Sequence, residues 1–172
     1  MHTSSLSLAL TSFLVAATQA QQAGTPTLTL DDATRVIDAA KAESRSLNCS
    51  SVIAVVDGGG WLIKLERMDN PAMLVSVELA PGKARAAALY RKQTAELEKS
   101  IDTGRVAAVT APGLIQMQGG IPLVINSVIV GAVGVSTDTP AHDQAIAEAA
   151  SKALGPCRLL IPLVTGGSAP KA

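Results

Sequence analysis

The chain has 172 residues, and its fourteen lysines and arginines balance its fourteen aspartates and glutamates, so its formal net charge is zero. It contains one tryptophan, one tyrosine and one phenylalanine. A nucleic-acid-binding surface needs concentrated basic residues and, for single strands, aromatic side chains on which bases stack. The balanced charge and the scarcity of aromatics therefore argue against nucleic acid as a partner.

The first 20 residues have the features of a secretory signal peptide. Residues 6–17 are mostly apolar and too few to span a bilayer, and residues 18–20, Thr-Gln-Ala, resemble a cleavage site before Gln21. Because no lysine or arginine precedes the apolar run, an N-terminal helix of the folded protein is the alternative. After cleavage no apolar run long enough for an anchor remains, so we expect a soluble periplasmic or secreted protein without membrane contact.

Two cysteines remain after this cleavage, Cys49 and Cys157. In an oxidising compartment such a pair indicates one disulfide, which would join the end of the first predicted helix to the C-terminal segment. Two free thiols are the alternative. The two residues lack Cys-x-x-Cys spacing, so the sequence does not indicate a zinc or redox motif of that kind.

The mature chain begins with a polar linker, residues 21–28, and the first helix is predicted directly after it. Thr29 and Asp32 have the spacing of a capping box, with aspartate in the position usual for glutamate. Apolar residues between 33 and 40 recur with a helical period, which predicts a helix to about residue 46.

Two strands are predicted next. Residues 52–56 form an unbroken apolar run, and residues 61–66 alternate between apolar and polar side chains. Residues 57–60, Asp-Gly-Gly-Gly, have the chemistry of a turn. The two strands should therefore pair as a hairpin, which is followed by a loop at residues 68–72.

Residues 73–101 have a mostly helical pattern, but Pro81-Gly82 predicts a break into at least two pieces. The piece at residues 83–89 is rich in alanine, which permits close packing against another helix or subunit. Thr94 is predicted to cap a further piece. In the weakly patterned stretch that follows, residues 106–109 indicate a strand.

A second hairpin is predicted near the end of the domain. Two apolar, β-branched runs, residues 121–125 and 128–135, are separated only by Asn126-Ser127, and asparagine tolerates the positive φ of a tight turn. A helix then begins, with Thr139 as its cap and Pro140 at its first position.

These elements predict an α+β fold: a mainly antiparallel sheet of four or five strands, built from two hairpins and flanked by helices. We expect residues 29–165 to form a single domain and residues 166–172 to form a flexible tail.

Polar side chains gather where the second hairpin passes into the last helix. Ser136, Asp138, His142 and Asp143 lie close together in the sequence and are predicted to face one ligand. His142 is the single histidine that remains after cleavage, and an unperturbed imidazole pKa near 6.5 suits proton transfer at neutral pH. The cluster therefore predicts acid–base chemistry on a ligand bound at this site, and a solvated helix cap is the alternative.

Several short motifs occur in a fixed order: Leu30-Asp-Asp-Ala33, Ala54-Val-Val-Asp57, Arg67-Met-Asp69, Ser76 to Ala88 with Lys83-Ala84, Gly119-Gly-Ile-Pro122, Gly131-Ala-Val-Gly-Val-Ser136 and Asp143. In this order they resemble the haem-binding HbpS/GlcG-like family over residues 28–154. The resemblance implies a domain that assembles into homo-oligomers and a link to extracellular haem binding and degradation. It also implies that some family members are encoded beside genes for the catabolism of small acids.

Haem as the cofactor would need an iron ligand, and His, Met, Cys and Tyr supply that ligand in proteins. His142 is the first candidate for the metal, and Met117 and Tyr90 follow it; a core methionine is the alternative role for Met117. Gly119 and Gly120 would let the cofactor approach the backbone closely, or would simply end a loop.

Three basic residues are candidate partners for haem propionates or for a small carboxylate. They are Arg67, Lys83 and Arg85. A guanidinium group binds a carboxylate through two parallel hydrogen bonds, which makes arginine well suited to this role. Surface salt bridges with nearby acids are the alternative.

The sequence leaves three functions open. The first is a secreted or periplasmic protein that binds haem, with haem degradation as a further activity. The second is an enzyme that acts on a small carboxylic metabolite through the Ser136, Asp138, His142 and Asp143 cluster. The third is a noncatalytic oligomeric sensor or accessory protein.

Overall fold

The structure is a computed structural model that describes residues 26–154. Its elements, in chain order, are α1 (Leu30–Ser46), β1 (Val52–Asp57), β2 (Leu62–Arg67), α2 (Ser76–Tyr90), α3 (Thr94–Asp102), the 3-10 helix η1 (Val106–Thr110), β3 (Gly120–Ile125), β4 (Val128–Ser136) and α4 (Pro140–Ser151).

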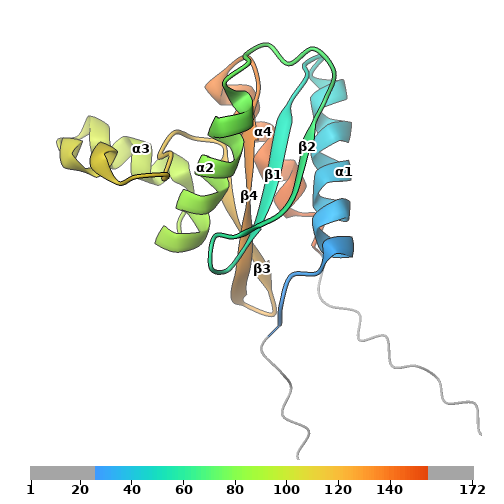
Figure 1. Cartoon of the computed structure of the whole chain (residues 1–172), viewed down its shortest axis with the longest axis horizontal. Helices are drawn as coiled ribbons and strands as arrows, with labels where there is room; N and C mark the ends of the chain where they lie inside the picture. The colour runs from blue at the N-terminus through green and yellow to red at the C-terminus, as the bar shows by residue number, and fades with distance from the viewer. Residues whose placement is uncertain (1–25, 155–172) are drawn as a thin grey trace, which may run out of the picture.

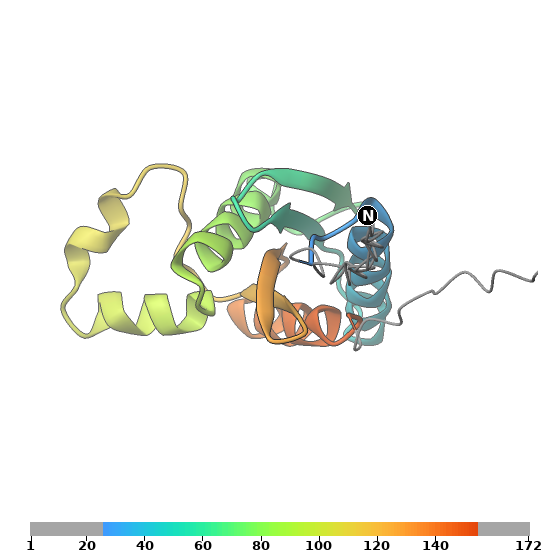
Figure 2. The same ribbon diagram turned by 90° about the horizontal axis from the view of Figure 1, so that it is seen from below.

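The described residues confirm the predicted α+β class. Four antiparallel strands form one sheet in the order β2-β1-β4-β3, so the two predicted hairpins meet through their inner strands β1 and β4. Helices α1 and α4 cover one face and α2 covers the other, as Figures 1 and 2 show from two directions.

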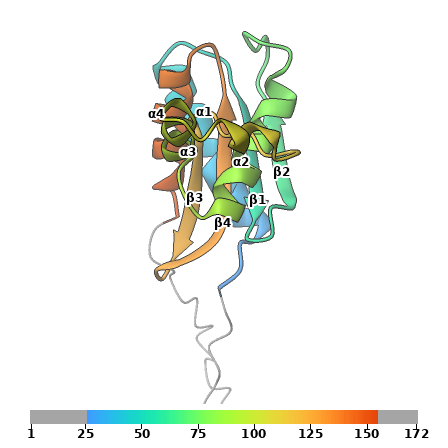
Figure 3. The ribbon, with the colours of Figure 1, turned by 90° about the vertical axis from the view of Figure 1, so that its left-hand side faces the viewer.

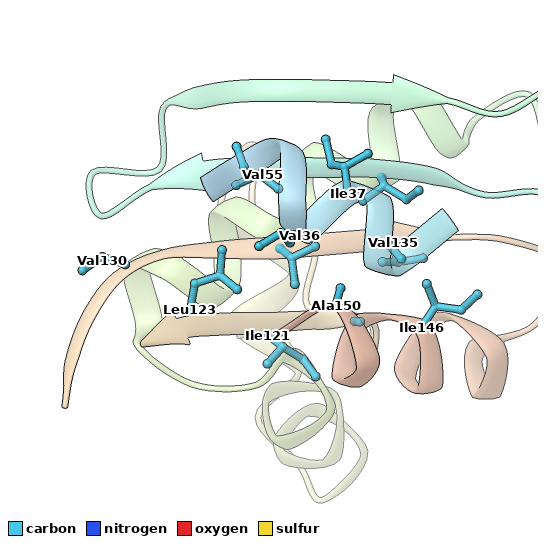
Figure 4. Packing of buried hydrophobic residues seen from close by; sticks show 14 of the residues in the cluster. Val36, Ile37, Val55, Ile121, Leu123, Val130, Val135, Ile146 and Ala150 are labelled. Atoms are coloured by element: carbon cyan, nitrogen blue, oxygen red, sulfur yellow. The ribbon is translucent and has the colours of Figure 1, made fainter. Parts of the chain in front are cut away.

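The largest apolar cluster lies between the sheet and helices α1 and α4 (Figure 4). Val36 and Ile37 of α1 and Ile146 of α4 are fully buried there against Val55 and Val135 of the central strands. Each such side chain contributes about 1.5–3 kcal/mol by leaving water. This cluster therefore fixes α4, which carries much of the predicted site.

Three local signals, two at helix starts and one at a turn, are confirmed. Asp32 N donates to Thr29 Oγ1 at 3.1 Å and Thr29 N donates to Asp32 Oδ2 at 3.0 Å, which is the reciprocal pattern of a capping box. Asn126 and Ser127 both have positive φ, 49° and 64°, as a tight hairpin turn requires. The Thr139 side chain accepts from His142 N at the start of α4.

The predicted break at Pro81-Gly82 is wrong, because α2 continues through both residues. The helix also packs closely on the sheet there: Gly134 of β4 has no side chain, and the helix backbone at Ala80 lies directly on it. The alanine-rich stretch packs on the sheet of its own chain, where Ala84 and Ala87 are buried. The helix ends instead at Arg91, whose φ of 55° is left-handed.

Two further local predictions are wrong in the segment after α2. Residues 106–109 belong to η1 and not to a strand. With α3 they form an arm that projects from the sheet in Figures 1 and 2 and points toward the viewer in Figure 3. None of the four strands in the described part of the chain pairs with these residues. Thr94 is the first residue of α3 and not its cap, because its hydroxyl accepts from Gly120 N at 2.7 Å.

Some predictions fall outside the described residues. These are the signal peptide at residues 1–20, the tail at residues 166–172, and Cys157 as the disulfide partner of Cys49. Within residues 26–154, no helix combines the length and the hydropathy that crossing a membrane requires.

Candidate functional site

Two of the predicted site residues form a buried ion pair. Lys83 Nζ of α2 lies 2.5 Å from Asp143 Oδ2 of α4, and the two side chains are 1% and 5% exposed. The ammonium group also donates to the carbonyl oxygen of Val135 at 3.2 Å. The other carboxylate oxygen accepts from Thr137 N and Thr137 Oγ1, at 2.6 and 2.7 Å.

Asp143 thus occupies the position beside the Lys83 ammonium group that a ligand carboxylate would need. A ligand would reach the ammonium group only by displacing Asp143 from its hydrogen bonds. Removing one member of a buried pair typically costs about 3–5 kcal/mol, because the other charge stays buried without compensation. The structure therefore supports a structural role for both residues.

Gly119 and Gly120 run between the two helices that carry this pair. A Cβ on Gly120 would lie 2.5 Å from the carbonyl oxygen of Lys83, and a Cβ on Gly119 would lie 2.7 Å from Asp143 Cβ. The close approach expected of these glycines is thus an approach to the protein's own helices. Gly119 also has a φ of 106°, which side chains disfavour.

The predicted polar cluster separates into buried and exposed groups. Ser136 is fully buried and its hydroxyl donates to Ser76 Oγ at 3.0 Å, while Asp143 faces Lys83. Asp138 and His142 are partly exposed, with side-chain exposures of 40% and 34%, and their Oδ1 and Nδ1 atoms lie 2.8 Å apart. The hydrogen bond from the His142 side chain holds the pKa of Asp138 below its usual value.

Cys49 lies beside this exposed pair, which the sequence analysis did not anticipate. One ligand atom each from Cys49, Asp138 and His142 lies within 4.8 Å of the others. Burial, followed by the charges of Asp138 and Asp143, raises the pKa of the Cys49 thiol. Only the packing of α1 beside α4 brings Cys49 close to a histidine 93 positions away, so no local sequence signal pointed to this contact.

The remaining candidates lie elsewhere. Arg67 ends β2 and pairs in register with Val52, which in turn pairs with Ser136, so Arg67 lies at the α4 end of the sheet. Tyr90 is half-buried at the end of α2. Met117 is 42% exposed and lines a cavity of about 310 Å³.

A second and larger cavity, of about 390 Å³, lies between the first hairpin and α2. We call it the Trp61 cavity; it is lined by Val56, Gly60, Trp61, Leu62, Glu78, Pro81, Gly82, Arg85, Gly113 and Ile115. Trp61 is 68% exposed. The guanidinium carbon of Arg85 lies 5.4 Å from the centroid of the Trp61 ring, and Arg85 Nη1 donates to Gly60 O at 3.4 Å.

The Trp61 cavity and the Met117 cavity share Ile115 in their walls. Ile115 N donates to the carbonyl oxygen of Gly82 at 3.1 Å, and its side chain occupies the space that a side chain at Gly82 would need. The glycine in α2 thus lets the loop after η1 lie against the helix. The sequence identified Arg85 as a candidate residue but assigned no binding role to Trp61. Residue spacing in a sequence does not show which parts of a sheet and a helix become neighbours in the folded protein.

Comparison with known proteins identifies the class of protein to which this fold belongs. The chain belongs to the family of haem degrading proteins like HbpS, whose model matches residues 28–152. Protein GlcG of Escherichia coli K12 is 44% identical over 104 residues, which are 60% of this chain and 77% of the relative.

Two solved structures agree with this assignment. A crystal structure of HbpS superposes with a TM-score of 0.71 at 28% identity, covering 82% of this chain and 99% of the other. A crystal structure of a PduOC:heme complex superposes with a TM-score of 0.69 at 27% identity, covering 75% and 96%. The family resemblance expected from the motifs is confirmed.

Proposed function

We propose that this protein binds haem in the Trp61 cavity. The observation that carries the proposal is the pairing of an exposed tryptophan with an arginine at the mouth of a largely apolar cavity. Family membership supports haem as the ligand, as does the likeness to a relative solved as a haem complex.

The cavity residues match the parts of a haem molecule. The Trp61 ring offers a face for stacking on the macrocycle, and Val56, Leu62 and Ile115 supply apolar contacts. A guanidinium group has five N–H donors, so Arg85 retains donors for a propionate while it contacts Gly60 and the indole ring. The Arg85 guanidinium group and the apolar contact surface thus lie together in one cavity beside α2.

The iron ligand is proposed to come from the neighbouring cavity. None of the described residues that line the Trp61 cavity is a histidine, methionine, cysteine or tyrosine. Met117 lines the adjacent cavity, two residues from the shared wall at Ile115, and its thioether is a known haem ligand. His142 lines neither cavity, so Met117 replaces it as the first candidate.

Hemin titration of the purified protein, followed by the Soret band, tests this proposal. Arg85→Ala is expected to weaken binding about tenfold or more, because a hydrogen bond to a charged group contributes about 1.5–3 kcal/mol. Arg35→Ala is the matched control, since Arg35 is an exposed arginine paired with Asp32 at the start of α1. Equal affinities of the two variants would contradict the proposed site.

Secretion and haem degradation form the second part of the proposal. Export through residues 1–20 places the protein in the periplasm or outside the cell, which N-terminal sequencing of exported protein tests at Gln21. Haem degradation is tested in the hemin titration by a time-dependent loss of the Soret band after a reductant and oxygen are added. A Soret band that does not decrease would mean that the protein binds haem without degrading it.

A further inference from the structure

Three side chains of different metal-binding chemistry converge on the side of the sheet away from the Trp61 cavity. They are the thiol of Cys49, the carboxylate of Asp138 and the imidazole of His142. They come from the loop after α1, the loop after β4 and the first turn of α4, all on the face that α1 and α4 cover. Their ligand atoms lie within 4.8 Å of one another.

Hydrogen bonds hold the backbone at two of the three residues, Cys49 and His142. Cys49 N donates to Ser44 O at 3.0 Å, and the preceding Asn48 has a φ of 54°, which turns the chain out of α1. His142 N is held by the Thr139 cap. The cluster is therefore built on two packed helices, which limits the movement needed to bring three ligands together.

We propose that Cys49, Asp138 and His142 bind a divalent transition-metal ion of the Zn²⁺ type. Zn²⁺ binds thiolate, imidazole and carboxylate ligands together, whereas Mg²⁺ and Ca²⁺ select oxygen. A deprotonated thiol and a carboxylate supply two negative charges to balance the ion. These charges offset the helix N-terminus of α4, which by itself disfavours a cation.

The distances between the ligand atoms indicate how the site would change when the ion binds. Two ligands on one tetrahedral zinc ion lie about 3.3–3.6 Å apart, given bonds of about 2.0–2.3 Å. The 2.8 Å between His142 Nδ1 and Asp138 Oδ1 is shorter, because a proton lies between these atoms. The ion would replace that proton and move the two side chains slightly apart.

Three protein ligands leave a fourth position of a tetrahedral ion for water or for an exogenous ligand. The side chains of Asp138 and His142 are 40% and 34% exposed, so this position opens toward solvent. The site would therefore accept metal from solution. Its use of Cys49 also excludes a simultaneous disulfide to Cys157, so oxidation and metal binding would compete.

Cobalt titration of the reduced full-length protein tests the proposal, because Co²⁺ reports its ligands in the visible spectrum. We expect a thiolate-to-metal charge-transfer band and tetrahedral d–d bands, both lost when Zn²⁺ is added. Cys49→Ser should abolish the charge-transfer band. Asp138→Asn and His142→Ala should each weaken binding by at least about tenfold, because changes at partners that only support metal ligands already cost about 10–100-fold.

Matched variants separate this site from other ligands in the chain. Cys157→Ser, His2→Ala and Asp31→Asn remove a thiol, an imidazole and an exposed carboxylate that the proposed site does not use, and each should bind cobalt as the unmodified protein does. Circular dichroism checks the fold of every variant. No charge-transfer band in the reduced protein, or a band that survives Cys49→Ser and disappears in Cys157→Ser, would overturn the proposal.

Discussion

At the scale of single residues, the buried Lys83–Asp143 pair is the strongest constraint near the candidate site. It joins helices on opposite faces of the sheet, and Thr137 satisfies the second carboxylate oxygen. The paired charges and the glycines beside them form one arrangement, since a side chain on Gly119 would contact Asp143. This arrangement holds the start of β3 between α2 and α4.

Lys83→Met tests this constraint. The free energy of unfolding is expected to fall by about 3–5 kcal/mol, because Asp143 would stay buried without its counter-charge. The double variant Lys83→Met with Asp143→Leu should be less damaged than Lys83→Met alone. Urea unfolding measures both. A loss below about 1 kcal/mol for Lys83→Met would show that the pair is dispensable.

The Asp138–His142 contact predicts a pH effect of known sign. Because the pKa of Asp138 is lowered in the folded protein, its contribution to stability is present above the unfolded pKa. That contribution is lost as the pH falls through the lower folded value. In His142→Ala, an NMR titration should find the pKa of Asp138 raised toward 3.8, the value for an unperturbed aspartate. An unchanged pKa would mean that the imidazole does not act on the carboxylate.

At the scale of elements, the parts that could be predicted are those fixed by neighbours in the chain. The Thr29 and Thr139 caps and the Asn126-Ser127 turn depend on residues within four positions, and all three are confirmed. Local helix rules gave a break at Pro81-Gly82, whereas α2 continues through both residues. Its backbone at Ala80 packs on Gly134, more than fifty positions away, a contact that local rules do not include.

Thr29→Ala tests the contribution of the capping box. We expect the free energy of unfolding to fall by about 1 kcal/mol, because α1 would lose the side-chain acceptor for one of its first N–H groups. Thr27→Ala is the control, because Thr27 is exposed and lies before the helix. Equal stabilities of the two variants in urea would contradict the assigned role of Thr29.

The difference between local and long-range contacts also determines which parts of the candidate site could be predicted from the sequence. His142 and Asp138 are four positions apart on one helical turn, and their contact was accessible from spacing. Lys83 and Asp143 are sixty positions apart, and Cys49 and His142 are farther still. Trp61 meets Arg85 only because β2 lies beside α2 in the folded protein. Long-range contacts of this kind leave no periodic signal in one sequence.

At the scale of the whole molecule, apolar side chains are exposed where α2 begins and on the α3–η1 arm. The large ones are Met73, Leu74, Val75, Val77, Val106, Val109 and Met117. Exposed apolar surface of this kind marks contacts between proteins, and most soluble oligomers are built from identical chains. We expect the protein to form a homo-oligomer, as the sequence also predicted.

Light scattering at micromolar concentration tests assembly. The expected mass is a multiple of the mass of one mature chain, and Val109→Asp should reduce it by placing a charge on the arm. Val124→Asp, on the edge strand β3, is the control, because Val124 is also an exposed valine but lies outside the arm. A monomeric unmodified protein would contradict the prediction.

The central claim is that the Trp61 cavity binds haem, and hemin titrations of two variants compare it directly with the site expected from the sequence. Trp61→Ala should weaken binding about tenfold or more, since it removes the largest contact surface of the cavity. His142→Ala should leave hemin affinity unchanged, because His142 does not line the cavity. The reverse result, with affinity lost in His142→Ala and kept in Trp61→Ala, would contradict the account.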